Sequence, residues 1–145
     1  MRVCTKAYGE IDVDPRQHMH FPLGLFGFED HEEWVLLDAK EQPFYWLQSL
    51  SSEQVAFVLI DPRIFRPDYQ LSVPPEDLEE IEATADDQVL VFAIVTIPDQ
   101  MRDMTANLQG PVVINRRTRV GRQAITSDPR WRVRHQILEE MATVG

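Results

Sequence analysis

The sequence is poor in cysteine and has no long apolar run. Cys4 is the only cysteine among 145 residues, so no disulfide can form within the chain, which fits a reducing compartment. The longest wholly apolar run, Val89 to Val95, has seven residues, whereas a membrane-spanning helix needs about 20. Residues 1–6 also lack the apolar stretch of a secretory signal peptide. We therefore expect a cytoplasmic protein with no membrane partner.

Basic residues are scarce as well. Lys and Arg number 14 against 24 Asp and Glu, which leaves a formal net charge of −10. This charge repels phosphate and argues against nucleic acid as the default partner of the whole surface. With 43% hydrophobic residues, the composition and the length predict a single domain over residues 1–145 with its own core. We expect the tail from about residue 136 to be flexible.

Motifs of catalysis are missing too. The sequence contains no P-loop, no G-x-G-x-x-G and no G-x-S-x-G. Cys4 has no histidine nearby in the sequence, so a structural thiol is the favoured interpretation. His18 and His20 would share one strand face, with His31 and His135 as further candidate metal ligands, but two spaced histidines are a weak signal. We therefore expect no catalytic site, no metal and no cofactor, and a protein that is not an enzyme.

Short apolar segments with a period of two dominate the chain. The segments that predict strands are residues 10–13, 34–37, 44–47, 55–60, 89–97, 112–114 and 123–125. The runs 55–60 and 89–97 are continuously apolar, which predicts strands buried on both faces. Turn signals recur about every 8–12 residues. The sequence therefore predicts a mainly all-β fold, an antiparallel β-barrel-like single domain.

One short helix is expected near residues 74–82. Prolines are tolerated in a first helical turn, and acidic residues near that end suit the helix dipole. Leu78 and Ile81 would form its buried stripe. The segment Ile137 to Met141 is also compatible with a second short helix. Residues 119–122 predict a hairpin turn in which Gly121 supplies a positive φ.

Charge is concentrated in two blocks of opposite sign. Glu76 to Asp87 holds seven acidic residues and no base, and Arg116 to Arg134 holds seven arginines and one acid. Three interpretations stay open. The blocks are solvated faces, they pair with each other, or they are docking surfaces of which the acidic one attracts a basic partner.

The arginine block also raises the alternative of a regulator that binds RNA. Arg130, Arg132 and Arg134 alternate with other residues, which predicts that the three share one strand face. Arginines beside an aromatic ring such as Trp131 can bind RNA. Only one aromatic residue is available there and the net charge is negative, so direct nucleic-acid binding is the weaker alternative.

Five segments, in their order along the chain, resemble the FliW family of flagellar assembly factors. They are Thr5 to Ile11, Phe21 to Glu29, Phe44 to Ser49, Asp61 to Tyr69 and Met104 to Asn115. The resemblance implies an antiparallel β-barrel with little helix and no enzymatic activity. It also implies two partners, newly made flagellin and the translational repressor CsrA. A FliW protein that is free of flagellin binds CsrA and antagonises it. We expect a monomer.

The resemblance and the charge together suggest candidate contact residues. For CsrA we expect an acidic surface, made of Glu29, Asp30, Glu32, Glu33, Glu76, Glu79 and Glu80. For flagellin we expect the motif loops, with Phe65, Pro67, Asp68, Tyr69, Asn107 and Asn115. The alternative for the second set is structural, because the aromatic residues would also suit a barrel core and the asparagines would also cap turns.

Overall fold

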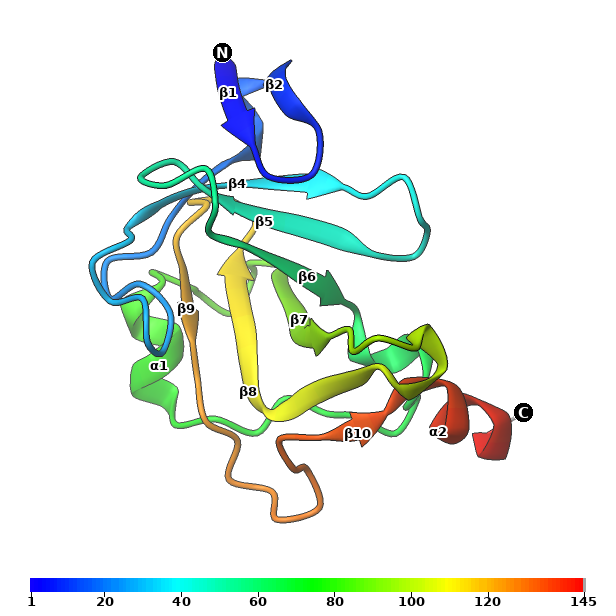
Figure 1. The fold of residues 1–145 in the computed structure, drawn as a ribbon. Coiled ribbons are helices and arrows are strands. Elements are labelled where there is room, and N and C mark those ends of the chain that lie inside the picture. Colours follow the sequence, from blue (N-terminus) through cyan, green and yellow to red (C-terminus); the bar gives the residue numbers. More distant parts are fainter. Residues whose placement is uncertain (145) are drawn as a thin grey trace.

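The computed structural model describes residues 1–144, and within them it has ten β-strands, two α-helices and three 3-10 helices (Figure 1). The strands are β1 (Arg2–Thr5), β2 (Gly9–Asp12), β3 (His18–His20), β4 (Glu33–Asp38), β5 (Tyr45–Ser49), β6 (Ala56–Ile60), β7 (Val89–Thr96), β8 (Thr105–Asn115), β9 (Gly121–Gln123) and β10 (His135–Gln136). The α-helices are α1 (Pro75–Glu80) and α2 (Ile137–Val144). The 3-10 helices are Pro15–Gln17, Pro62–Ile64 and Met101–Asp103.

One antiparallel sheet winds almost into a barrel. Its strand order is β10-β8-β7-β6-β5-β4-β3, and β9 pairs with the other side of β8. The N–H of His20 donates to the carbonyl of Arg119 at 2.9 Å, and an isolated bridge joins His20 to Val120. This contact links β3 to the segment before β9 and nearly closes the sheet, while β1 and β2 form a separate hairpin at one end (Figure 1). The predicted mainly β, antiparallel barrel-like fold is confirmed.

Strand β7, inside the sheet between β8 and β6, is buried on both faces, as its continuous apolar run predicts. Successive side chains of a strand point to opposite faces, and in β7 the two faces contact different core clusters. The two sets are Val91, Ala93 and Val95 on one side and Leu90, Phe92 and Ile94 on the other. A third cluster, which includes Val3 and Val35, lies between the β1–β2 hairpin and β4.

Strand β8 is much longer than the predicted segment 112–114. It runs from Thr105 to Asn115, and its register with β7 shifts between Phe92 and Ile94. At the shift, the N–H groups of Leu108 and Gln109 donate to the carbonyl of Arg132. Pro111, which has no N–H, sits where β8 leaves the regular ladder. Pro111 therefore interrupts the apolar pattern in the sequence, although β8 bends at this point and continues.

The predicted helix and hairpin are both present, but the role of Gly121 is different from the expected one. Helix α1 lies within residues 74–82, and α2 covers the second segment. In the β8–β9 turn the positive φ of 60° belongs to Arg119. Gly121 is required for another reason, because a Cβ there would lie 2.5 Å from Cζ of the buried ring of Phe21.

The expected strand through Arg130, Arg132 and Arg134 does not form. These residues lie in the connection between β9 and β10, which turns at Pro129 and Arg130. Trp131 points into the core, with a relative exposure of 1%. It therefore has no free face on which a base could stack, and the arginines do not form one strand face.

The tail from residue 136, expected from the sequence to be flexible, is described up to residue 144. The tail from residue 136 contains the end of β10 and α2, and Ile137 at the start of α2 is buried in the core. Among residues 1–144, no helix combines the length and the apolar character that a membrane crossing requires.

Candidate functional site

The acidic block and the arginine block contact each other around α1. The Arg117 guanidinium donates to the Asp87 carboxylate from Nε at 2.8 Å and from Nη2 at 3.0 Å. Arg122 pairs with Asp77 at 3.3 Å and also with Glu80. We call Asp77, Glu80, Asp87, Arg117 and Arg122 the α1 cluster. Pairing between the two blocks, one of the three open interpretations, is therefore present in the structure.

Asp87 is the most enclosed carboxylate of the α1 cluster, with a side chain 7% exposed. The hydrogen bonds from Arg117 hold the pKa of this carboxyl well below its usual range, and the N–H of Thr84 adds to the effect. Asn115 Nδ2 also donates to it at 3.2 Å. The ionised Asp87 carboxylate thus ties the segment after α1 to the β8–β9 turn.

The remaining acidic candidates divide into exposed and paired residues. Glu33 contacts both His18, at 2.7 Å, and His20, and Glu80 contacts Arg122. The other five are exposed and have no ion pair within residues 1–144, and they are Glu29, Asp30, Glu32, Glu76 and Glu79. The loop after β3 lies beside α1, because Leu23 and Glu80 line one hollow of about 210 Å³. The acidic residues predicted for CsrA therefore come from two segments, α1 and residues 29–33, and the start of the loop that leads to the second segment lies beside α1.

The four histidines are not brought together. His18 and His20 share Glu33, His31 Nδ1 bonds the Ser49 hydroxyl at 2.7 Å, and His135 lies in another part of the fold. In the portion of the chain that the structure describes, no group of three or more His, Cys, Asp or Glu side chains is arranged to hold a metal.

A second charged group surrounds the buried Trp131. Arg66 and Arg130 place their Cζ atoms 4.6 Å and 4.9 Å from the centroid of its ring, which is cation–π geometry. Arg66 also pairs with Asp68 at 2.9 Å and with Glu140 at 2.6 Å. The tryptophan cluster consists of Arg66, Asp68, Tyr69, Arg130, Trp131, His135 and Glu140. It joins the loop after β6 to α2.

Both aromatic residues proposed for flagellin are part of the core. Phe65 is 0% and Tyr69 is 2% exposed. The Tyr69 hydroxyl donates to the carbonyl of Leu108 at 2.9 Å, and its ring centroid lies 4.9 Å from that of Trp131. Burial raises the pKa of Tyr69 to about 12. Neither residue presents a surface to a partner in this structure, so the structural alternative applies to both.

Asn107 and Asn115 stabilise turns, as the structural alternative for the flagellin set predicts. Asn115 is fully buried, accepts from the N–H of Arg117 at 3.0 Å and donates to the carbonyl of Ile81 at 3.1 Å. Asn107 Oδ1 accepts from the N–H groups of Gln109 at 3.0 Å and Gly110 at 2.9 Å, which stabilises the bend of β8. Asn115 is therefore excluded as a direct contact, whereas Asn107 is half-buried and reaches the surface.

Pro67 and Asp68 remain accessible. Both are exposed, and Arg66 holds the pKa of Asp68 below its usual value by a side-chain hydrogen bond. Asp68 also lies 3.9 Å from Arg130 in the β9–β10 connection. The proposed flagellin surface is thus reduced to three members, Pro67, Asp68 and Asn107.

Reasoning from the sequence missed an exposed apolar loop. Leu23 and Phe26 are 55% and 52% exposed. Gly24, with a φ of +63°, leaves no room for a Cβ against the backbone of Phe28, and this fixes the loop. The N–H of Phe26 donates to Gln123 Oε1 at 3.0 Å and anchors the loop to β9. The sequence feature that indicates this loop is the motif Phe21 to Glu29, of which only the acidic residue Glu29 was predicted as a contact residue.

The same loop borders a hollow that contains a proposed contact residue, Asn107. Phe26, Asn107, Val133 and Arg134 are among the residues that line this hollow of about 310 Å³. Val133 is also 52% exposed. An exposed aromatic ring and an aliphatic side chain beside an amide and a guanidinium form the mixed apolar and polar surface typical of protein interfaces.

Comparison with known proteins places this chain in a family. The model of the FliW protein family matches residues 2–137. The chain belongs to the FliW family. The flagellar assembly factor FliW of Treponema denticola is 42% identical over 145 residues, which cover 100% of this chain and 99% of that protein. The FliW of Treponema pallidum is 40% identical over 142 residues, 98% of this chain and 95% of that protein.

A solved structure agrees with the FliW assignment. The crystal structure of a flagellar assembly factor FliW matches this fold with a TM-score of 0.87 at 34% identity, and covers 94% of this chain and 96% of that one. The family resemblance of the five sequence segments is confirmed.

Proposed function

We propose that this FliW-family protein is a flagellar assembly factor that acts by binding proteins in the cytoplasm and not as an enzyme. Flagellin occupies it while flagellin is abundant. After flagellin has been exported, the freed protein binds and antagonises the repressor CsrA, so that flagellin synthesis follows export. The observation that carries this proposal is the family match over residues 2–137. Such a switch needs only that filling one site weakens the other.

The exposed acidic residues support the location of the CsrA contact. Glu76 and Glu79 lie on α1, and Glu29, Asp30 and Glu32 lie on the loop between β3 and β4, whose start lines a hollow with Glu80 of α1. A translational repressor such as CsrA binds RNA and therefore carries a basic surface. Complementary charge speeds the encounter of such a protein with an acidic surface. The α1 cluster holds the helix in place while it leaves these five carboxylates free.

The β9–β10 connection supports the location of the flagellin contact. At one end Arg130 approaches Asp68, and at the other Val133 and Arg134 line the hollow that contains Asn107. Pro67, Asp68 and Asn107 therefore border one connection, although they come from distant parts of the sequence. A partner that covers this connection can contact all three residues.

Size-exclusion chromatography with flagellin from the same genome tests the proposed function. We expect co-elution with intact flagellin and none with flagellin that lacks its C-terminal helix. If neither form co-elutes with the protein, flagellin is not its partner, and the proposal fails for flagellin.

Charge reversal tests the CsrA surface. We expect the triple variant Glu29→Lys, Glu76→Lys and Glu79→Lys to slow association with CsrA by about tenfold or more, because steering by charge accelerates encounter by factors of this size. The matched control reverses Glu41, Glu53 and Asp99, which are exposed residues elsewhere. Equal association rates for the two triple variants, measured by surface plasmon resonance, would contradict this location.

A further inference from the structure

The first half of β7 has an open edge. β6 pairs with β7 only from Val58 to Ile60, opposite Ala93 to Val95. The chain then turns away into the 3-10 helix Pro62–Ile64, whose start is capped by Asp61. Residues 89–92 therefore have β8 on one side and, in the described chain, no strand on the other.

The hydrogen-bonding pattern shows which backbone groups point to this open side. The N–H of Arg116 donates to the carbonyl of Gln88 at 3.0 Å, so Gln88 faces β8. In an antiparallel pair the direction alternates along the strand. The N–H and C=O groups of Val89 and Val91 therefore face away from β8, and neither N–H has an acceptor within residues 1–144.

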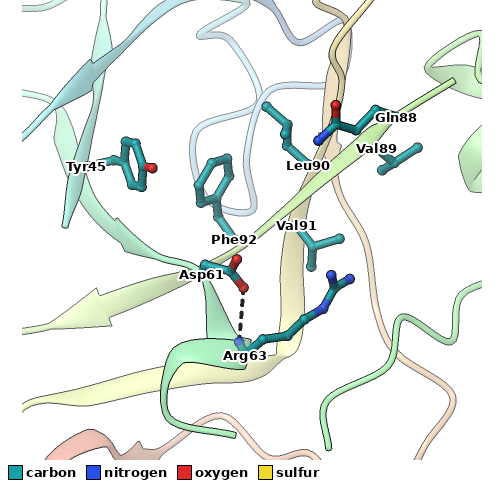
Figure 2. Close-up of a pocket in the computed structure, with 8 residues that line it drawn as sticks. All are labelled: Tyr45, Asp61, Arg63, Gln88, Val89, Leu90, Val91 and Phe92. Atoms are coloured by element: carbon teal, nitrogen blue, oxygen red, sulfur yellow. Dashed lines mark hydrogen bonds between the residues drawn. The ribbon is translucent and has the colours of Figure 1, made fainter. Parts of the chain in front are cut away.

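A narrow hollow runs along the same edge. It is lined by the consecutive residues 88–92 together with Tyr45, Asp61 and Arg63, and its volume is about 160 Å³ (Figure 2). Pockets for drug-sized ligands are larger, at about 300–1,000 Å³. An extended main chain needs less room and uses unpaired backbone groups, as in the addition of a strand to a sheet edge.

The charges that line the hollow indicate which charged group a bound peptide segment would place there. Arg63 is exposed and has no ion pair among the described residues. The nearby Asp61 carboxylate accepts from the N–H of Arg63 at 3.0 Å, so this acid is engaged in capping the 3-10 helix. A guanidinium of this kind binds a carboxylate through charge-assisted hydrogen bonds.

We propose that the edge of β7 at Val89 and Val91 binds an extended segment of a partner protein, with a carboxylate of that segment on Arg63. The inference rests on the proposed function, because it assigns the segment to flagellin. Arg63 belongs to the loop that also carries Pro67 and Asp68. The proposed carboxylate site on Arg63 is therefore carried by the same loop as two members of the proposed flagellin surface.

Substitutions at Val89 test the backbone contact. Val89→Pro removes an N–H that the fold itself does not use, and proline is tolerated at such an edge. Val89→Ala is the matched control, since it shortens the side chain and keeps the N–H. We expect the affinity for flagellin, measured by calorimetry, to fall about tenfold for Val89→Pro, the size of one lost hydrogen bond together with steric blocking of the edge. We expect Val89→Ala to stay within about twofold of the wild type.

A second pair of variants tests the charge. Arg63→Gln is expected to weaken flagellin binding about threefold to tenfold and to reduce its dependence on salt, because a charge-assisted hydrogen bond is lost. Arg102→Gln removes another exposed arginine and is expected to leave the affinity unchanged. Circular dichroism melting curves show whether each variant is folded.

Amide hydrogen exchange on the wild-type protein gives a reading that needs no substitution. We expect exchange at Val89 and Val91 to slow when flagellin binds. The inference is wrong, and the proposed function stands, if flagellin binds the wild-type protein without slowing exchange at Val89 and Val91. In that case Val89→Pro and Arg63→Gln also bind flagellin with the affinity of the wild type. If flagellin does not bind the wild-type protein, both are wrong.

Discussion

The tryptophan cluster and the α1 cluster both join the acid-rich part of the chain to the arginine-rich part, but Arg66 in the first and Arg117 in the second differ in burial. In the tryptophan cluster the side chains of Arg66 and Glu140 are 24% and 22% exposed, and the guanidinium packs on a buried indole. In the α1 cluster the side chain of Arg117 is 59% exposed. Exposed pairs contribute about 0–1 kcal/mol, whereas desolvated cation–π contacts contribute about 2 kcal/mol. The ion pairs of Arg66 and Arg117 are therefore expected to stabilise the fold to different extents.

The largest effect is expected from the core side of the tryptophan cluster. Tyr69→Ala removes a ring that contacts Trp131 and leaves a cavity. We expect the free energy of unfolding, from urea titration, to fall by about 3–5 kcal/mol, the range for truncating a buried aromatic residue. A loss of flagellin binding with unchanged stability would instead support the original assignment of Tyr69 as a contact residue.

Tyr69→Phe is the matched control for that substitution. It keeps the ring and removes only the hydroxyl that donates to Leu108. Because the buried carbonyl loses its donor, we expect a decrease of about 1–3 kcal/mol. Equal losses for the two variants would show that the hydroxyl, and not ring packing, dominates at this position.

The next prediction compares the two clusters directly. Arg66→Met removes two ion pairs and a cation–π contact, and we expect the free energy of unfolding to fall by about 1.5–3 kcal/mol. Arg117→Met removes a more exposed guanidinium, and we expect a decrease of about 0–1 kcal/mol. Urea titration at low and high salt measures both. A larger loss for Arg117→Met would reverse the comparison.

The smallest effect concerns pH. The pKa of Asp87 is lower in the folded protein than its ordinary value of 3.8. Its stabilising contribution is therefore complete above the ordinary pKa and is lost as the pH falls through the lower, folded value. We expect Asp87→Asn to flatten the decrease in the free energy of unfolding below about pH 4. Asp99→Asn, at an exposed position, is the control and is expected to leave the acid limb unchanged.

The apolar patterns predicted most of the strands because they report local alternation. The runs 55–60 and 89–97 became β6 and β7, and the acid-rich segment near residue 76 became α1. The same method failed at β8, where Pro111 interrupts the pattern although the strand continues through a bend. It also failed at residues 130–134, where alternation predicts a strand but an inward Trp131 and a turn are found.

The candidate site was predicted less well than the fold. The aromatic residues Phe65 and Tyr69 were recognised as significant, but residue type alone does not separate an exposed contact from a core position. Phe26 lay inside a recognised motif and is exposed because Gly24 and a hydrogen bond to Gln123 hold its loop away from the core. The first constraint is local, since Gly24 meets the backbone of Phe28, but the second joins residues 97 positions apart in the chain.

By itself, the sequence determined the fold class, the charge of each part of the chain and the family. Periodicity, composition and ordered motifs are properties of the chain before it folds. Only the tertiary structure decided that Arg117 meets Asp87, that Gly121 makes room for Phe21 and that β7 keeps an open edge after Ile60. The physical reason is that these features arise from the packing of distant segments, which local patterns do not encode.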